Sequence, residues 1–399
     1  MAHPIFQQRM QLRLYTAVMR MMTRKQTARR MAAAVALWSA TMVAAVAQGR
    51  TATQAHTPLQ QALGAMGPDA FVCELTVTSP AIAKNQLGAS GKVAVAIHGT
   101  RGWQECRRAG SACRVLLFLP GFDGSPQITY LGPTFALREA LDDAVAKDKL
   151  PPLVVVVPDP RTVLGGSFYT DSAVNGHWAT FLLDELLPGV EAALGIPDGA
   201  HRRWVAGHSM GGFGTLHLAL LRPGHWQGAV AISPVASTHF AEGARLRAAA
   251  AARHARPDHL QTLLAKPTTA RFSERLFWAM SAAWTSSARA TRWQDALAPG
   301  AEPALAADAR KDWLRLDPSS QIQRDDSACR LPHVVLTVGS KDSIIPAAEV
   351  EAVAKAFRDR CGDRMRLSLV VHDGNHGNRV RQDLLVGLAA LALPAPKKR

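Results

Sequence analysis

One short segment carries the residue types needed for nucleophilic chemistry. Residues 207–211 read G-x-S-x-G, with Ser209 at the centre and small residues on both sides. Residues 204–206 before it are an apolar strand candidate, and residues 213–221 after it favour a helix. Between a strand and a helix, this pattern forms a sharp turn that exposes the serine, and its glycines leave room for backbone packed against it. We therefore predict that Ser209 is a nucleophile, the alternative being a glycine-rich connection without chemistry.

A serine hydroxyl needs a base to take its proton, and the base needs an acid to orient it. In α/β-hydrolases the chain order is serine, acid, histidine, each in a loop that follows a strand. Asp342 follows the predicted strand 334–338, and His376 follows the predicted strand 367–371. We predict that His376 is the base and that Asp342 is the acid.

Other titratable residues downstream of the serine fit these roles less well. His372 is the rival base, but it sits nearer the strand and is expected to be structural. Asp325 and Asp326 precede a strand, at the wrong end of the sheet. Glu349 falls at the start of a helix, where a capping or dipole role explains it.

An oxyanion hole needs two backbone N–H donors, one from the residue after the nucleophile and one from the loop after the third strand. Met210 and Phe122 occupy these positions, and Gly121 and Gly124 would let the backbone approach a substrate. The alternative is that residues 119–124 form only a turn. No metal-ligand spacing and no nucleotide-binding glycine pattern is present in the sequence, so we expect neither a metal nor a cofactor.

The elements that must position these residues alternate along the chain. The first two predicted strands read as antiparallel, and short apolar runs farther on indicate strands covered on both faces. This alternation predicts an α/β fold with a doubly wound, mostly parallel sheet, whose active site lies at the carboxyl ends of its strands. Strands are expected at 71–77, 93–97, 115–119, 153–157, 204–206, 228–232, 334–338 and 367–371, and helices at 135–146, 180–194 (perturbed by Pro188), 213–221, 347–360 and 380–393.

Residues 235–332 interrupt this alternation. They are rich in alanine and arginine and contain no convincing strand. Their position favours a helical cap inserted above the site. The segment contains Trp278, Trp284, Trp293 and Trp313, for which packing is a better explanation than substrate binding.

The N-terminal region has the features of an export signal. Residues 1–30 are basic without acids, 31–46 are apolar, and Ala45-Val46-Ala47 forms an A-x-A cleavage site. We predict a signal peptide over 1–47, a flexible lead-in over 48–67 and a hydrolase domain over 68–395, exported to the periplasm or secreted. The alternative is an uncleaved anchor, although the run is shorter than the roughly 20 residues of a membrane span. A later start methionine or a twin-arginine signal at Arg29-Arg30 remains open.

Charge and cysteines agree with this interpretation. The formal net charge of +15 includes seven basic residues of the predicted signal, and the rest of the surplus is spread out, so nothing predicts nucleic-acid binding. Cys106 and Cys113 bracket a short polar loop, while Cys329 precedes a strand and Cys361 ends the next helix. We predict these two disulfides and a buried, unpaired Cys73.

Four motifs resemble the "Putative esterase" family of α/β-hydrolases, which includes S-formylglutathione hydrolases, feruloyl esterases and mycolyltransferases. They are G-H-S-M-G-G at 207–212, G-G-S-F-Y-T-D at 165–171, T-F-L-L-D-E-L-L-P at 180–188 and G-S-K-D-S-I-I at 339–345. The likeness spans about 70–235 and 330–395 and supports Asp342. It also implies that Phe168 and Tyr169 line the pocket, unless they only pack their loop. The cap is longer than in compact members, and 374–378 lacks the usual aromatic residue after the histidine.

The function predicted from these residues is that of an exported serine esterase acting through an acyl-enzyme. Its substrate would be a small-molecule, carbohydrate or lipid ester. The alternatives are an acyltransferase that passes the acyl group to a sugar or lipid hydroxyl, and a non-catalytic surface-binding protein on the same scaffold. A peptidase is less favoured, because no gating domain precedes the hydrolase part.

Overall fold

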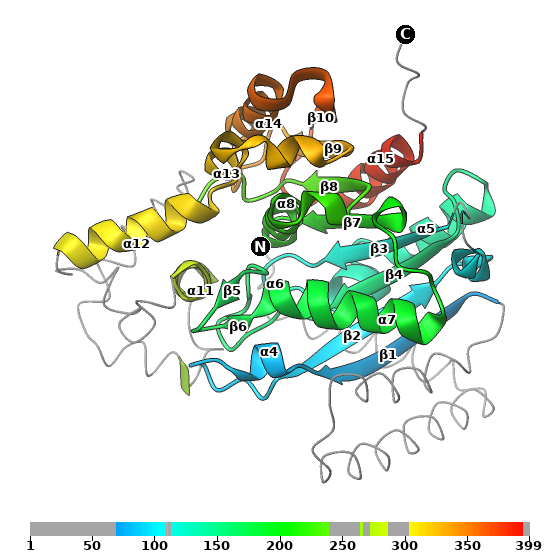
Figure 1. Cartoon of the computed structure of the whole chain (residues 1–399), viewed down its shortest axis with the longest axis horizontal. Coiled ribbons are helices and arrows are strands. Elements are labelled where there is room, and N and C mark those ends of the chain that lie inside the picture. The colour runs from blue at the N-terminus through cyan, green and yellow to red at the C-terminus, as the bar shows by residue number, and fades with distance from the viewer. Residues whose placement is uncertain are drawn as a thin grey trace, which may run out of the picture. The chain divides into compact units, whose positions relative to one another are not determined.

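An eight-stranded sheet forms the centre of the computed structural model (Figure 1). The structure describes residues 69–108, 110, 113–238, 264–265, 272–285 and 303–393, so the predicted signal peptide, the lead-in and Trp293 lie outside the described residues. Within this sheet only β2 runs against the other strands. The strands are, in spatial order, β1 (Phe71–Thr78), β2 (Lys92–Gly99), β4 (Leu153–Pro158), β3 (Arg114–Leu119), β7 (Arg203–His208), β8 (Gly228–Ile232), β9 (His333–Gly339) and β10 (Arg366–His372).

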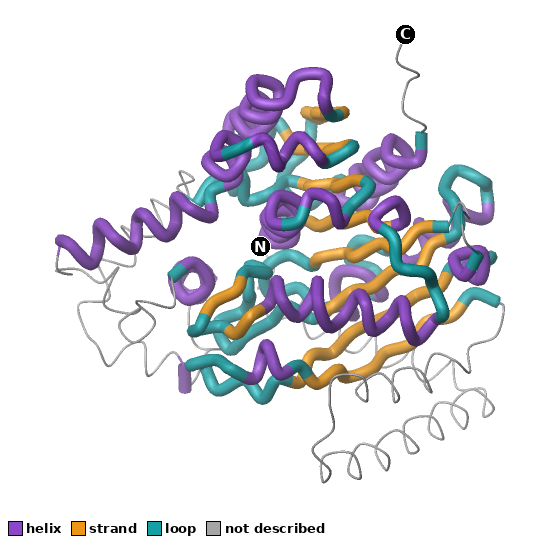
Figure 2. Tube along the Cα trace, viewed as in Figure 1, coloured by secondary structure: helices purple, strands orange, loops and turns teal. Residues whose placement is uncertain are grey.

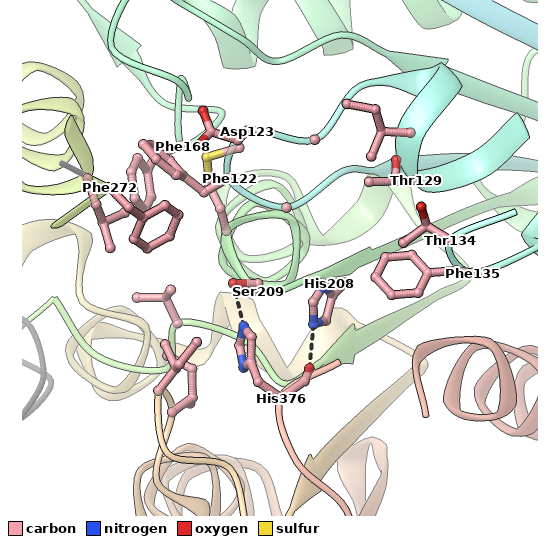
Figure 3. A pocket seen from close by; sticks show the side chains of 18 of the residues that line it. Phe122, Asp123, Thr129, Thr134, Phe135, Phe168, His208, Ser209, Phe272 and His376 are labelled. Atoms are coloured by element: carbon pink, nitrogen blue, oxygen red, sulfur yellow. Dashed lines mark hydrogen bonds between the residues drawn. The ribbon is translucent and has the colours of Figure 1, made fainter. Parts of the chain in front are cut away.

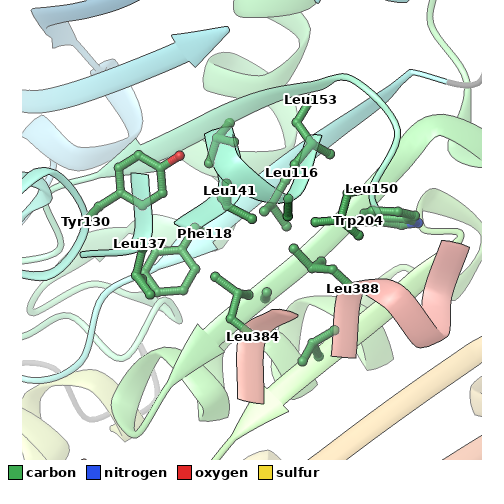
Figure 4. Close-up of a cluster of buried hydrophobic side chains, with 14 of the residues drawn as sticks. Leu116, Phe118, Tyr130, Leu137, Leu141, Leu150, Leu153, Trp204, Leu384 and Leu388 are labelled. Carbon is green, nitrogen blue, oxygen red and sulfur yellow. The ribbon is translucent and has the colours of Figure 1, made fainter. Parts of the chain in front are cut away.

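Helices cover both faces of the sheet. On one face, α5 (Leu137–Ala146) and α15 (Val380–Ala392) pack against alternate residues of the central strands, among them Leu116, Phe118 and Trp204 (Figure 4). On the other face lies α8 (Met210–Leu221), which contacts β3, β7 and β8. With helices on both sides, strands such as β4 are apolar throughout and buried along their whole length.

The order of the strands places the predicted site. The chain passes from β3 through α5 to β4 on one side, then returns to β7 on the opposite side of β3. Loops after β3 and β7 therefore diverge at a topological switch point, where ligands bind in open α/β sheets. The predicted doubly wound, mostly parallel sheet is confirmed.

The helix predicted over 180–194 is found as three joined pieces: α6 (Trp178–Thr180), a π-helical turn η4 (Phe181–Leu186) and α7 (Leu187–Leu194). Pro188 has no N–H to donate to Asp184, so regular α-helical hydrogen bonding cannot run through this point. Apart from α11 to α13, which are described next, the other helical segments are α4 (Pro80–Ala83), η2 (Trp103–Arg107), η3 (Pro126–Leu131), η5 (Ala200–Arg202), η6 (Pro223–His225), η9 (Asp326–Arg330), α14 (Ala347–Cys361) and η10 (Gly362–Arg364).

The segment between β8 and β9, called here the β8–β9 insertion (residues 233–332), is mainly helical where it is described (Figure 2). It contains α11 (Phe272–Trp284), α12 (Pro303–Leu316) and α13 (Pro318–Arg324). Of these, α13 contacts α8 and α14, whereas α11 contacts β5 (Asp171–Ser172), which forms a small hairpin with β6 (Gly176–His177). Trp278, Trp284 and Trp313 are buried, and Trp284 lies edge-on to Trp313 with ring centroids 4.9 Å apart, so these tryptophans pack.

Both predicted cysteine pairs, Cys106–Cys113 and Cys329–Cys361, are at disulfide distance. Cys73 on β1 is unpaired and partly buried, and burial raises the pKa of its thiol. None of the helices in the described ranges is long and apolar enough to cross a membrane.

Candidate active site

Ser209 stands at a sharp turn between β7 and α8. Its backbone has φ +59° and ψ −115°, a strained conformation for a residue with a side chain. Hydrogen bonds hold the turn: the Ser209 N–H donates to the Ile232 carbonyl at 2.9 Å, and the Ser209 carbonyl accepts from the N–H groups of Phe213 and Val235. The side chain is thus presented at the carboxyl end of the sheet by backbone on three sides.

The glycines around Ser209 are required by close backbone approaches. A Cβ on Gly211 would collide with the backbone of Leu119 and lie 2.8 Å from the Pro120 carbonyl oxygen. A Cβ on Gly207 would collide with the backbone of Gly211. Backbone cannot move aside as a flexible side chain can, so both positions need glycine, as the pattern predicts.

His376 lies between Ser209 and Asp342 and is hydrogen-bonded to both. Its Nε2 is 2.9 Å from Ser209 Oγ, and its Nδ1 is 2.8 Å from Asp342 Oδ2 (Figure 3 shows the first contact). The other carboxylate oxygen of Asp342 accepts from the N–H groups of Ile344 and Ile345. The structure therefore brings the three residues predicted as nucleophile, base and acid into one line of hydrogen bonds.

The environment of Asp342 keeps its carboxylate charged. Burial alone would raise the pKa of Asp342, but hydrogen bonds from His376 and from two backbone N–H groups outweigh it and hold the pKa below its ordinary value. A charged carboxylate favours the imidazole tautomer with the proton on Nδ1. The lone pair on Nε2 then faces Ser209.

His208 contacts His376 through a hydrogen bond and through its ring. Its Nε2 donates to the His376 carbonyl at 2.7 Å, and the two rings lie 4.8 Å apart (Figure 3). Burial, and then the neighbouring His376, lower the pKa of His208 to about 3, so its ring stays uncharged at neutral pH and is a much weaker base than an ordinary imidazole. This hydrogen bond to the base was not predicted from the sequence.

The acid and base loops are bonded to each other. The Ser340 N–H donates to the His372 carbonyl at 2.7 Å, and the Lys341 N–H donates to the Gly374 carbonyl at 2.9 Å. Asn375 Oδ1 accepts from the N–H groups of Gly377 and Asn378 on the far side of His376. These hydrogen bonds fix the backbone of the loop that carries His376.

The rival acids and bases lie elsewhere. His372 is buried, and its Nε2 is 2.8 Å from Asp383 Oδ2 on α15, so it ties a strand to a helix. Asp326 pairs with Arg360 and Arg364 near the Cys329–Cys361 disulfide. Neither His372 nor Asp326 borders the cavity at Ser209.

A cavity of about 330 Å³ opens onto Ser209 and His376. Figure 3 shows Phe122, Phe168 and Phe272 on one side of Ser209, and Thr129, Thr134 and Phe135 on the other. Its lining is mostly apolar: Gly121, Phe122, Asp123, Gly124, Ile128, Thr129, Thr134, Phe135, Phe168, His208, Ser209, Met210, Val235, Phe272, Leu276, Met280, Ile344, Ile345 and His376. Among the residues that the structure describes, no group of three or more His, Cys, Asp or Glu side chains is placed to hold a metal ion.

The residues predicted as oxyanion donors, Phe122 and Met210, both border this cavity. Phe168, predicted to line the pocket, borders it as well, whereas its neighbour Tyr169 does not. Tyr169 is fully buried and its hydroxyl donates to the Pro120 carbonyl at 2.6 Å. Tyr169 thus supports the loop that carries Phe122 instead of facing a substrate.

One wall of the cavity was not predicted from the sequence. Phe272, Leu276 and Met280 of α11 line it at every fourth position, on one face of the helix. Their spacing could have indicated an apolar face, but nothing in the sequence showed what that face covers.

Comparisons with known proteins give one family match and two structures with a similar fold. A sequence model of the family described as "Putative esterase" matches residues 91–374. A ferulic acid esterase structure has 15% identity and a TM-score of 0.53, with 81% of this chain and 98% of that chain covered. An S-formylglutathione hydrolase from Agrobacterium tumefaciens has 18% identity and a TM-score of 0.50, with 82% and 97% covered.

At these identities the two structures show a shared fold, and no curated protein sequence matches the chain. The family match covers well over half of the chain. The strand order and the Ser209 turn described above agree with it. The chain belongs to the "Putative esterase" family of α/β-hydrolases and is a carboxylic ester hydrolase of the serine type.

Proposed function

We propose that this protein hydrolyses carboxylic esters through a covalent acyl-enzyme on Ser209. The observation that carries the proposal is the continuous chain of hydrogen bonds from Ser209 through His376 to Asp342, at the edge of a cavity. His376 Nε2 takes the hydroxyl proton as Ser209 Oγ attacks the ester carbonyl carbon. It then returns that proton to the departing alcohol, and the acyl group remains on the serine.

Deacylation repeats these steps with water. His376 takes a proton from a water molecule, whose oxygen attacks the acyl carbon, and gives it back to Ser209 Oγ as the carboxylic acid leaves. In both halves the carbonyl oxygen gains negative charge. The backbone N–H groups of Phe122 and Met210 would stabilise that charge, because they belong to the loop after β3 and the first residue of α8.

The lining of the cavity supports an uncharged substrate with an apolar group. Aromatic and aliphatic side chains dominate it, and the one carboxylate among the described lining residues, that of Asp123, pairs with Arg275. Phe272 and Ile128 border the cavity and are about half exposed, at 52% and 47%. The apolar surface therefore continues outward beyond Ser209.

The family match supports hydrolysis over the acyltransferase alternative. Export is proposed on two grounds: the basic, apolar and A-x-A sequence of residues 1–47, and two disulfides, which form and persist in oxidising compartments. Residues 235–332 are proposed to act as a cap, since α11 from this range borders the cavity.

Steady-state hydrolysis of p-nitrophenyl butyrate by residues 48–399 tests the proposal. Ser209→Ala and His376→Ala should each lower kcat by roughly 10³-fold or more, because the residues act as one unit. Ser90→Ala, an exposed serine on the surface, serves as the matched control and should behave as the wild type. Activity that survives in Ser209→Ala would refute the acyl-enzyme. Adding an alcohol acceptor and analysing the products would separate hydrolysis from acyl transfer.

A further inference from the structure

An ion pair joins α11 to the loop that carries Phe122. Arg275, in the first turn of α11, donates from Nη1 to Asp123 Oδ1 and from Nη2 to Asp123 Oδ2, both at 2.6 Å. The two side chains are 20% and 37% exposed, so solvent screens the contact only in part. Two-point arginine–carboxylate contacts fix geometry as well as charge. This contact bridges the β8–β9 insertion and the residue next to the predicted oxyanion donor.

The surrounding backbone leaves room for this pair. Asp123 has φ +59°, and its N–H donates to the Gly165 carbonyl at 3.0 Å. A Cβ on Gly165 would lie 2.6 Å from Asp123 Oδ1 and 2.9 Å from Arg275 Nη1. Gly165 therefore leaves the space that the pair occupies. A strained residue persists only where its neighbours hold it in place.

The same arginine touches the apolar wall. Its guanidinium lies above the Phe122 ring, 5.7 Å from the centroid, while Phe272 meets that ring edge-on at 5.3 Å. Phe272 and Leu276 flank Arg275 on α11 and border the cavity. One side chain thus contacts both the residue that carries the predicted donor and the helix that forms the wall.

The two ends of α11 are held differently. At its C-terminal end, the hydroxyls of Thr170 and Ser172 donate to the carbonyls of Ala283 and Ala282, and Trp284 is fully buried. At its N-terminal end Phe272 is 52% exposed, and Arg275 reaches Asp123 from the same turn. Loss of the ion pair would therefore release the first turn of α11 while its last turns stay in place.

We infer that Arg275 and Asp123 are a positioning pair that makes the apolar wall and the Phe122 N–H one rigid unit. The pair then governs two things together: how well an apolar acyl group packs on Phe272 and Leu276, and how well the oxyanion is held. The inference rests on the proposed function, in which Phe122 supplies an oxyanion donor. Neither residue touches the reacting atoms.

Arg275→Ala and Asp123→Asn test the inference, with kcat and KM measured on p-nitrophenyl octanoate and p-nitrophenyl acetate. Asparagine tolerates the positive φ of Asp123, so the backbone can stay in place while the charge and one of the two acceptor oxygens are lost. Each variant should lower kcat for both esters, because the oxyanion is held less well, and should raise KM for octanoate more than for acetate. We therefore expect kcat/KM to fall roughly ten-fold or more for octanoate, and by a smaller factor for acetate. The double variant should lose no more than either single one. Arg222→Ala is the matched control, since Arg222 makes a two-point contact with Asp184 outside the cavity.

If the ratio of kcat/KM for octanoate to kcat/KM for acetate stays at the wild-type value in a folded Arg275→Ala protein, the inference is overturned. If the alanine variant does not fold, Arg275→Lys takes its place, because lysine keeps the charge but cannot make the two-point contact. The same ratio is then measured, and an unchanged value again overturns the inference. Full activity in Ser209→Ala would instead refute the proposed function, so the two failures are distinguishable.

Discussion

At the scale of single residues, the base is held from several directions. Asp342 fixes the His376 ring, and His208 fixes the His376 backbone through its carbonyl. The pKa of His208 is about 3, so this donor stays neutral and does not compete for the serine proton at neutral pH. His208 is therefore expected to matter for the position of His376 and not for the binding of substrate.

Replacing His208 tests this role. His208→Ala should lower kcat roughly ten-fold with little change in KM, because the His376 carbonyl loses its donor and the base can drift from Ser209. His208→Gln, whose amide N–H can reach a carbonyl, should recover part of the loss. Steady-state kinetics on p-nitrophenyl butyrate give both values. An alanine variant with wild-type kcat would show that the hydrogen bond has no positioning role.

The sequence predicted the positions of Ser209, Asp342 and His376 because each belongs to a loop that follows a recognisable strand. Chain order and strand order then leave little freedom in where those loops meet. Arg275 and Phe272 could not be found in this way. They belong to the β8–β9 insertion, where no strand pattern specifies which helix face meets which loop.

At the scale of elements, the turn between β7 and α8 depends on the absence of side chains. Gly211→Ala would force a methyl group into the Leu119 backbone, and the strand β3 cannot yield. We expect a loss of roughly 3 kcal/mol or more in the free energy of unfolding, together with loss of activity. Gly224→Ala is the matched control, because a Cβ there has nothing within 4 Å.

Urea unfolding of both variants measures the difference. If Gly211→Ala unfolded at the same urea concentration as the wild type, the tight approach of β3 to this turn would be wrong. The control should stay within about 0.5 kcal/mol of the wild type, as surface substitutions do.

The strands were predictable to within about a residue or two, most reliably the central ones, because those are short apolar runs covered on both faces. β8, for example, spans Gly228–Ile232, the range predicted for it. The hairpin of β5 and β6 was not predicted, since two residues in each strand give no periodicity to detect. The π-helical turn before Pro188 was expected only as a perturbation, because the sequence does not specify how a helix absorbs a proline.

At the scale of the whole molecule, buried histidines make stability depend on pH. The pKa of His208 is lowered to about 3, and those of His217, His225 and His333 to about 4, mainly by burial, from 6.5. Below pH 6.5 the unfolded chain binds protons at these positions and the folded chain does not, so stability falls as the pH drops from about 6.5 to about 4. Each histidine contributes at most about 1.4 kcal/mol per pH unit.

The raised pKa values of Glu191 and Asp383 oppose this trend, so the slope should stay below the sum of the four histidine contributions. Urea unfolding at pH 7.5, 6.0 and 5.0 measures how the free energy of unfolding changes with pH. His333→Asn should reduce this slope by the contribution of about one proton. A free energy of unfolding that rises between pH 6.5 and 5.0 would contradict this account.

The two disulfides also concern the molecule as a whole. Protein purified from an exporting host and unfolded without reductant should expose one free thiol, Cys73, out of five cysteines. Reduction before the assay should raise the count to five. Five thiols without reduction would show that neither pair forms and would remove one of the two grounds for export, whereas three would show that only one pair forms.

The central claim is an activated serine at position 209. Residues 48–399 would be treated with a fluorophosphonate probe, and mass spectrometry would locate the label. The account predicts label on Ser209 alone, lost in Ser209→Ala and strongly slowed in His376→Ala, because an unactivated hydroxyl reacts poorly. A folded protein that takes up no label, or takes it up equally well in His376→Ala, would contradict it.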